Sequence, residues 1–297
     1  MRIRILQQAR GRVPGDGVEL AFGYWPGRGT PVVALHGITA NQAGFIGVAE
    51  RLAGRRPLFA LDLRGRGDSD KPASGYGMEQ HARDVAAAMR AMGLGPSLII
   101  GHSMGGFVAT ALASQNPELV SGLLLVDGGL AIKPTGNTPA SEHVRAALTE
   151  RINQLVRTYE SRQAYLAFWK AQPTFPPEDW NQWIEAFLDY EVGGEGPVQP
   201  KALQAAVLAD LMEGVNTDTI LNRSRVLRVP VTFVRAETGF TNTQPPLYPD
   251  AIMDELRSYT PNLKDHKIDG TTHYTVLLGD RGASEIADLI ANSLEAN

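Results

Sequence analysis

Ser103 lies in the most distinctive short motif of the sequence, the segment GHSMGG at residues 101–106, which contains the pattern G-x-S-x-G. A short apolar run at residues 97–100 precedes this motif, and a helical pattern follows it to about Gln115. A strand that turns sharply into a helix strains the backbone at the turn, and flanking glycines remove Cβ clashes. Because such a turn projects its central side chain above the sheet, we predict that Ser103 is a nucleophile.

A serine hydroxyl is a poor nucleophile near neutral pH, so a base must take its proton. The chain has six histidines. His273 is one candidate, and it follows the last predicted strand in a short loop before the final helix. His102 is next to Ser103, and neighbours on a sharp turn point apart, so we expect His102 to form a wall of the pocket. His36 precedes a turn and is expected to be structural. The other three lie in a predicted helix, the central helical region and a predicted strand, at His81, His143 and His266.

The elements that must position these residues follow a strand–helix rhythm. Short apolar runs without alternation indicate strands buried on both faces, and helical patterns separate them. This rhythm predicts an α/β fold with a doubly wound, mostly parallel sheet and helices on both faces. The predicted strands are residues 2–6, 18–25, 31–35, 58–61, 97–100, 123–126, 229–234 and 263–268. The predicted helices are 78–92, 249–259, 283–294 and one that follows the sharp turn at 101–106 and runs to about Gln115.

The rhythm stops between residues 130 and 225, where the patterns are helical and aromatic residues are frequent. We therefore predict a sheet domain formed by residues 1–129 and 226–297, interrupted by a helical cap at residues 130–225. Trp180, Trp183 and Phe187 are spaced to share one helical face, and Trp169 belongs to a second aromatic group. Some of these aromatics are expected to border the substrate, and we name Trp169, Trp180 and Trp183 with His102 as pocket residues.

Composition excludes several classes of protein and site. The chain has 297 residues and no cysteine, so disulfides, thiolate metal sites and a cysteine nucleophile are excluded. The formal net charge is −4, and no basic excess points to nucleic acid. No H-x-x-x-H spacing indicates a metal, and we expect no cofactor. We see no signal peptide and no apolar run long enough to span a membrane, so we expect a soluble, cytoplasmic monomer or homodimer.

Four segments together resemble the α/β-hydrolase superfamily. They are Leu35-His36-Gly37, the segment DLRGRGDS at residues 62–69, GHSMGG at 101–106, and Gly270-Thr271-Thr272-His273. The resemblance implies Ser103 as nucleophile and His273 as base, and it argues against relatives that carry aspartate at the nucleophile position. It also implies that the backbone N–H groups of Ile38 and Met104 form the oxyanion hole.

The carboxylate behind the histidine is less obvious. The family usually places it after the strand that follows the cap, at position 239, where this chain has glycine. Asp127 ends the preceding strand, a place used by some branches, and it keeps the chain order serine, acid, histidine. We favour Asp127, with Glu237 as second choice and a smaller weight on Asp250 or Asp254.

The resemblance implies a serine hydrolase that cleaves carboxylic esters through an acyl-enzyme. We expect a medium-sized apolar or aromatic ester, or a lactone, which is a cyclic ester. Two enzymatic alternatives use the same three residues: a carbon–carbon bond hydrolase of ring-cleavage products and a cofactor-free perhydrolase. A less favoured alternative is a ligand receptor of the same fold without catalysis, because fold alone does not determine function.

Overall fold

The structure is a computed structural model that describes residues 8–132, 148–213, 217–260 and 262–293. Its centre is an eight-stranded sheet with strand order β1-β2-β4-β3-β5-β6-β7-β8. β1 and β2 pair antiparallel, β2 pairs antiparallel with β4, and the remaining neighbours are parallel. The strands are Ala9–Pro14 (β1), Glu19–Trp25 (β2), Val32–Leu35 (β3), Leu58–Leu61 (β4), Ser97–His102 (β5), Val120–Val126 (β6), Val231–Ala236 (β7) and Leu263–Ile268 (β8). The α/β fold class with a mostly parallel sheet is confirmed.

The central strands are apolar along their whole length because both faces of the sheet are covered. In β3, Val33 and Leu35 belong to the core on one face, while Val32 and Ala34 belong to the core on the other. The first core contains residues of the helices Met78–Ala91 (α2), Met104–Gln115 (α3) and Thr217–Val226 (α8). The second contains residues of Ile46–Leu52 (α1), Thr275–Leu278 (α10) and Asp280–Asn292 (α11).

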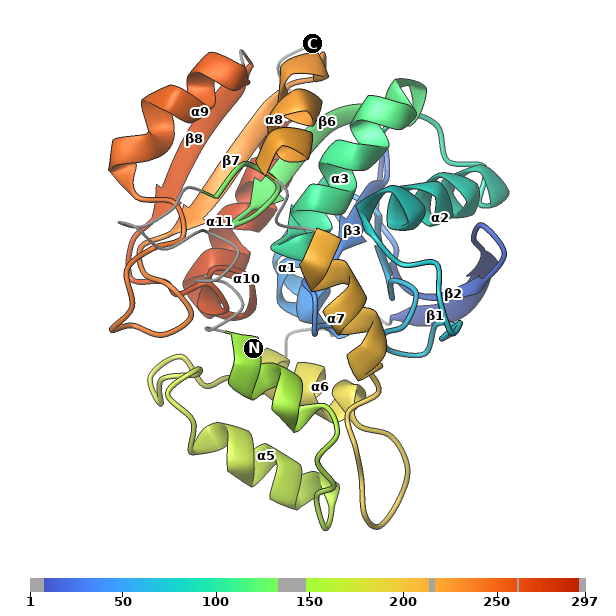
Figure 1. Cartoon of the computed structure of the whole chain (residues 1–297), viewed down its shortest axis with the longest axis vertical. Helices are drawn as coiled ribbons and strands as arrows, with labels where there is room; N and C mark the ends of the chain where they lie inside the picture. Colours follow the sequence, from blue (N-terminus) through green and yellow to red (C-terminus); the bar gives the residue numbers. More distant parts are fainter. Residues whose placement is uncertain (1–7, 133–147, 214–216, 261, 294–297) are drawn as a thin grey trace.

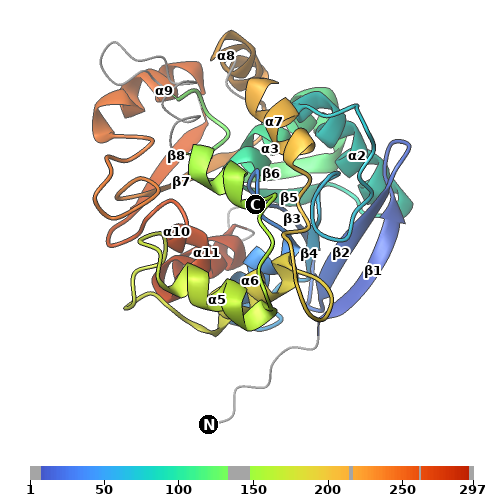
Figure 2. The same ribbon diagram turned by 60° about the horizontal axis from the view of Figure 1, so that its bottom comes forward.

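A group of helices is inserted between β6 and β7. It includes Arg162–Lys170 (α5), Gln182–Glu191 (α6) and Gln204–Glu213 (α7). Figures 1 and 2 show α5 and α6 lying together outside the sheet and its two helix layers, whereas α8 lies beside α3. Tyr165, Trp169 and Phe187 are among the buried residues of a third, largely aromatic core in this region. The exact limits of the cap stay a prediction.

Several element boundaries differ from the sequence expectation. The strand predicted at residues 2–6 lies outside the described residues, and β1 instead occupies Ala9–Pro14. The helix predicted from Pro249 starts as a short 3-10 turn at Asp250–Ile252 and continues as Met253–Tyr259 (α9). Further 3-10 turns occupy Gln42–Phe45 (η1) and Pro117–Leu119 (η2). Among the helices of the described residues, none is both long and apolar enough to cross a membrane.

Candidate active site

Ser103 stands between β5 and α3 in a strained backbone conformation, with φ 53° and ψ −119°. This turn fits only because glycines surround it. A Cβ on Gly105 would lie 2.1 Å from the backbone oxygen of Leu35, and a Cβ on Gly128 would lie 2.3 Å from the backbone oxygen of Ser103. A strained residue of this kind persists only where the surrounding structure holds it, which is typical of functional sites.

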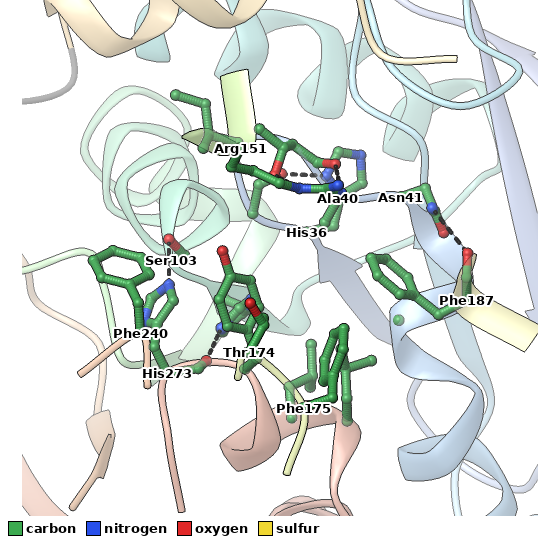
Figure 3. A pocket seen from close by; sticks show the side chains of 18 of the residues that line it. His36, Ala40, Asn41, Ser103, Arg151, Thr174, Phe175, Phe187, Phe240 and His273 are labelled. Carbon is green, nitrogen blue, oxygen red and sulfur yellow. Dashed lines mark hydrogen bonds between the residues drawn. The ribbon is translucent and has the colours of Figure 1, made fainter. Parts of the chain in front are cut away.

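Three predicted residues meet at the carboxyl ends of the parallel strands. His273 Nε2 lies 3.1 Å from Ser103 Oγ (Figure 3). His273 Nδ1 lies 2.6 Å from Asp127 Oδ2. An ionised carboxylate can only accept, so Nδ1 carries the proton and Nε2 is free to accept the serine proton. His273 is 146 positions from Asp127 and 170 positions from Ser103 in the sequence. The sheet brings the three residues together.

The other candidate acids face different partners. Glu237 accepts a 2.6 Å hydrogen bond from the backbone N–H of Gly270. Asp250 pairs with Arg235, and Asp254 pairs with Arg257. By contrast, the second oxygen of Asp127 accepts from the backbone N–H of Ala236 at 3.2 Å, which fixes the carboxylate. Of the four candidates, Asp127 is the one whose carboxylate bonds to His273.

The two neighbouring histidines are buried and neutral. Burial lowers the pKa of His102 to about 3, with a further contribution from His273. Burial also lowers the pKa of His36 to about 3. His102 Nε2 lies 2.8 Å from the backbone oxygen of His273, and His36 Nε2 accepts from the N–H of Leu63 at 3.0 Å. His102 therefore holds the backbone of His273 in place. His36 connects the end of β3 to the segment that follows β4.

The predicted oxyanion-hole residues lie beside Ser103. Met104 opens α3, and the first N–H groups of a helix have no partner within it. Ile38 follows β3 and is buried. Its carbonyl accepts a 3.0 Å hydrogen bond from Arg66 Nε. The segment at residues 62–69, which served above only as evidence of resemblance, thus supplies an arginine that fixes the peptide unit after Ile38.

Two cavities meet at Ser103. The first contains His273 and His102 and is lined mainly by aromatic and aliphatic side chains, with Arg151, Thr39 and Asn41 among its polar residues. The second is also lined mainly by apolar side chains, and its lining residues are Ile38, Met78, Ser103, Met104, Phe107, Asp127, Ile132, Leu148, Asp210, Leu211, Phe240 and Leu247. A substrate held at Ser103 can therefore extend in two directions.

Of the predicted pocket residues, His102 and Trp169 line the first cavity and two tryptophans do not. The Asn181 side chain accepts from the N–H groups of Trp183 and Ile184 and so caps α6. Trp180 consequently lies outside the helix and cannot share its face. Trp183 packs against Gly47 and donates to Glu50 at 2.8 Å, so it joins α6 to α1.

Sequence reasoning missed Arg151, Phe175 and Phe240, which all line the first cavity. Arg151 had a readable signal. It lies on the same helical face as Leu148 and Leu155, three residues after one and four before the other, and both leucines are buried. A charged residue on an apolar helix face requires a buried partner. Within the described part of the chain, no cluster of three or more histidine, aspartate or glutamate residues could hold a metal ion.

Comparison with known proteins places this architecture. A family model described as "alpha/beta hydrolase fold" matches residues 30–280. The chain belongs to this family. It is 30% identical to the 2-(acetamidomethylene)succinate hydrolase of Mesorhizobium japonicum over 251 residues, which are 84% of this chain and 83% of that protein.

Solved structures with a similar fold agree with this assignment. The crystal structure of E-2-(acetamidomethylene)succinate hydrolase matches with a TM-score of 0.79 and 25% identity, covering 98% of this chain and all of that one. An N-acyl homoserine lactone degrading enzyme matches with a TM-score of 0.67 and 25% identity, covering 94% of this chain and 98% of that one. The chain is therefore a hydrolase of the alpha/beta fold.

Proposed function

We propose that this hydrolase cleaves acyl compounds through a covalent acyl-enzyme on Ser103. The observation that carries the proposal is the continuous hydrogen-bonded series from Ser103 Oγ through His273 to Asp127. In this proposal His273 is the base and Asp127 holds its tautomer and stabilises its cation. The backbone N–H groups of Ile38 and Met104 bind the developing oxyanion.

In the first half of the proposed reaction, Ser103 Oγ forms a bond to the substrate carbonyl carbon while His273 Nε2 takes the serine proton. The negative charge on the carbonyl oxygen is stabilised by the two N–H groups, each worth about 2.7–4 kcal/mol in a site of this kind. The bond from the carbon to the leaving group then breaks. His273 gives its proton to the departing atom, which leaves as an alcohol when the substrate is an ester.

In the second half, a water molecule adds to the acyl carbonyl and gives a proton to His273 Nε2. The tetrahedral intermediate collapses, the carboxylic acid leaves, and Ser103 Oγ regains the proton from His273. Every group returns to its starting state, so the cycle needs no external oxidant, reductant or metal.

A carboxylic ester or lactone is our first choice of substrate, as the similarity to a lactone-degrading enzyme supports. The name of the Mesorhizobium relative describes a succinate with an acetamido group rather than an ester. That name favours a second candidate, cleavage of an acyl–nitrogen bond by the same residues. Carbon–carbon bond hydrolysis, perhydrolysis and a receptor without catalysis remain as alternatives for the test.

The first experiment measures release of 4-nitrophenol from 4-nitrophenyl esters of increasing acyl length. We expect Ser103→Ala to lower kcat/KM by about 10⁴-fold or more, and Asp127→Asn to lower it by about 10⁴-fold. Glu237→Gln is the matched control and is expected to change kcat/KM by less than about threefold, because Glu237 bonds to Gly270 instead. Equal activity of wild type and Ser103→Ala would remove the proposal. A greater loss in Glu237→Gln than in Asp127→Asn would move the acid to Glu237.

A second experiment compares an ester, a lactone, an N-acyl amide and a vinylogous diketone of similar size. The compound with the highest kcat/KM identifies the bond cleaved. We expect the ester or lactone to lead, and a preference for the diketone would favour carbon–carbon hydrolysis.

A further inference from the structure

Arg151 is a buried cation at the edge of the first cavity. It lies in a helical segment at residues 148–154, and its side chain is 8% exposed. Its Nη2 pairs with Glu191, and its Nε donates to Thr39 Oγ1 at 3.2 Å. Its guanidinium also lies over the ring of Trp169, 4.4 Å from the ring centre. These contacts hold one edge of the guanidinium and fix its plane.

The other edge of the guanidinium is unsatisfied. Arg151 Nη1 is buried and has no hydrogen-bond partner among the described residues, and the same holds for Trp169 Nε1. Both residues line the cavity that contains Ser103. A buried donor without an acceptor carries a desolvation penalty, and native structures have few of them. Two such donors on stacked side chains at one cavity call for an acceptor that the protein itself does not supply.

We propose that Arg151 Nη1, with Trp169 Nε1 as second donor, binds a carboxylate of the substrate. An arginine N–H forms its strongest hydrogen bonds with carboxylate or phosphate oxygens. This inference rests on the proposed function and names its substrate class: acyl compounds that carry a free acid group. The succinate in the name of the Mesorhizobium relative is a compound of this class.

The pair with Glu191 explains how Arg151 can be buried while one of its donors stays without a described partner. Glu191 occupies Nη2, and its second oxygen accepts from Tyr165 at 2.6 Å. Nη1 takes no part in these hydrogen bonds. Figure 3 shows the side chains of Arg151 and Ser103 at the same cavity. The two residues belong to separate elements of the chain. The second cavity contains no arginine or lysine among its lining residues and would then take the uncharged arm of the substrate.

The test compares two esters that differ in one group, 3-acetoxybenzoate and 3-acetoxytoluene. For each enzyme the ratio of the two kcat/KM values is measured. We expect Arg151→Met to lower the ratio of acid to neutral ester by about 10- to 100-fold, the range of a hydrogen bond to a charged group. Arg151→Lys keeps the charge without the fork and should give an intermediate ratio.

The matched control is Arg157→Met. Arg157 is a nearby exposed arginine whose guanidinium lies over the rings of Tyr159 and Phe168, and its removal should leave the ratio unchanged. If Arg151→Met does not fold, Trp169→Phe removes the second donor and keeps an aromatic ring, and it should lower the ratio by about three- to tenfold. An unchanged ratio in the folded variants overturns the proposal.

A binding measurement separates this inference from the proposed reaction. Ser103→Ala is titrated by calorimetry with glutarate, alone and combined with Arg151→Met. We expect binding to Ser103→Ala and at least tenfold weaker binding to the double variant. Equal binding, or none to Ser103→Ala, contradicts the carboxylate site. An inactive wild type with Arg151-dependent glutarate binding would instead contradict the proposed reaction and leave the carboxylate site standing.

Discussion

Two buried arginines, Arg66 and Arg151, connect the inserted helices to the sheet domain, and they are satisfied to different degrees. Each nitrogen of the Arg66 side chain has a partner: Nε donates to Ile38, Nη1 to Arg64 and Asp210, and Nη2 lies 3.9 Å from a sulfur. Arg151 Nη1 has no hydrogen-bond partner in the part of the chain that the structure describes. The same residue type therefore has a described partner for every nitrogen in one place and one donor without a described partner in the other.

The paired carboxylates show the same contrast. Burial opposes ionisation of Asp210, but Arg66 and His81 outweigh it and hold its pKa at about 2. For Glu191, burial outweighs the attraction of Arg151, and its pKa is raised. Asp210 also accepts from the N–H of Gly77 at 2.6 Å. Asp210 thus accepts hydrogen bonds from Arg66, His81 and Gly77, which stabilise its negative charge. The carboxylate of Glu191 accepts from Arg151 and Tyr165, and these two bonds do not offset its burial.

The largest effect that tests this comparison is on stability. Arg66→Met leaves Asp210 and the carbonyl of Ile38 buried without their main donor, so we expect a loss of about 3–5 kcal/mol in the free energy of unfolding. Urea unfolding measures it. Arg90→Met, which removes an exposed pair with Glu118, should cost less than about 1 kcal/mol. A loss of similar size in both variants would mean that the buried Arg66 network stabilises the fold no more than an exposed ion pair.

Arg151→Met should destabilise less, by about 1–3 kcal/mol, because Glu191 can take up a proton when its partner is removed. The pKa of Glu191 is already raised and would rise further. When a group has a raised pKa in the folded state, the stability that its protonation contributes is lost as pH rises through that pKa. The stability lost in Arg151→Met relative to wild type should therefore be larger at pH 8 than at pH 5. Urea unfolding at the two pH values checks this, and a larger deficit at pH 5 would contradict it.

The smallest expected effect is on the pH dependence of stability. It distinguishes the two buried arginine–carboxylate pairs from the buried neutral histidines. Asp210 stays ionised at pH 4.5, so the Arg66 network cannot cause acid sensitivity there. His102, with a folded pKa of about 3, binds a proton in the unfolded state first. Stability should therefore fall as pH drops below 6.5, by about 1.4 kcal/mol per pH unit. His102→Gln should reduce the slope of unfolding free energy between pH 5.5 and 4.5 by that amount. Identical slopes would contradict the assignment.

The sequence predicted the sheet and the meeting of Ser103, His273 and Asp127 because each depends on local signals. Glycines mark the sharp turn at Ser103, and parallel strands bring their carboxyl ends to one edge. The pocket walls carry no such signal. Trp183 and Phe187 share a helix, yet one contacts α1 and the other lines the cavity. Their difference depends on how α6 packs against the sheet domain, and helical spacing alone does not contain that information.

Gly239 determines where a carboxylate can be placed at this edge of the sheet. β6 and β7 are neighbours, with Val126 opposite Val234, so a carboxylate after either strand starts from the same edge. In this chain the loop after β7 packs closely against position 239. A Cβ on Gly239 would lie 2.6 Å from the backbone oxygen of Pro245, and Phe240 lines the cavity. An aspartate at position 239 would collide with that loop, so Gly239→Asp alone could not place a carboxylate there unless the loop moved.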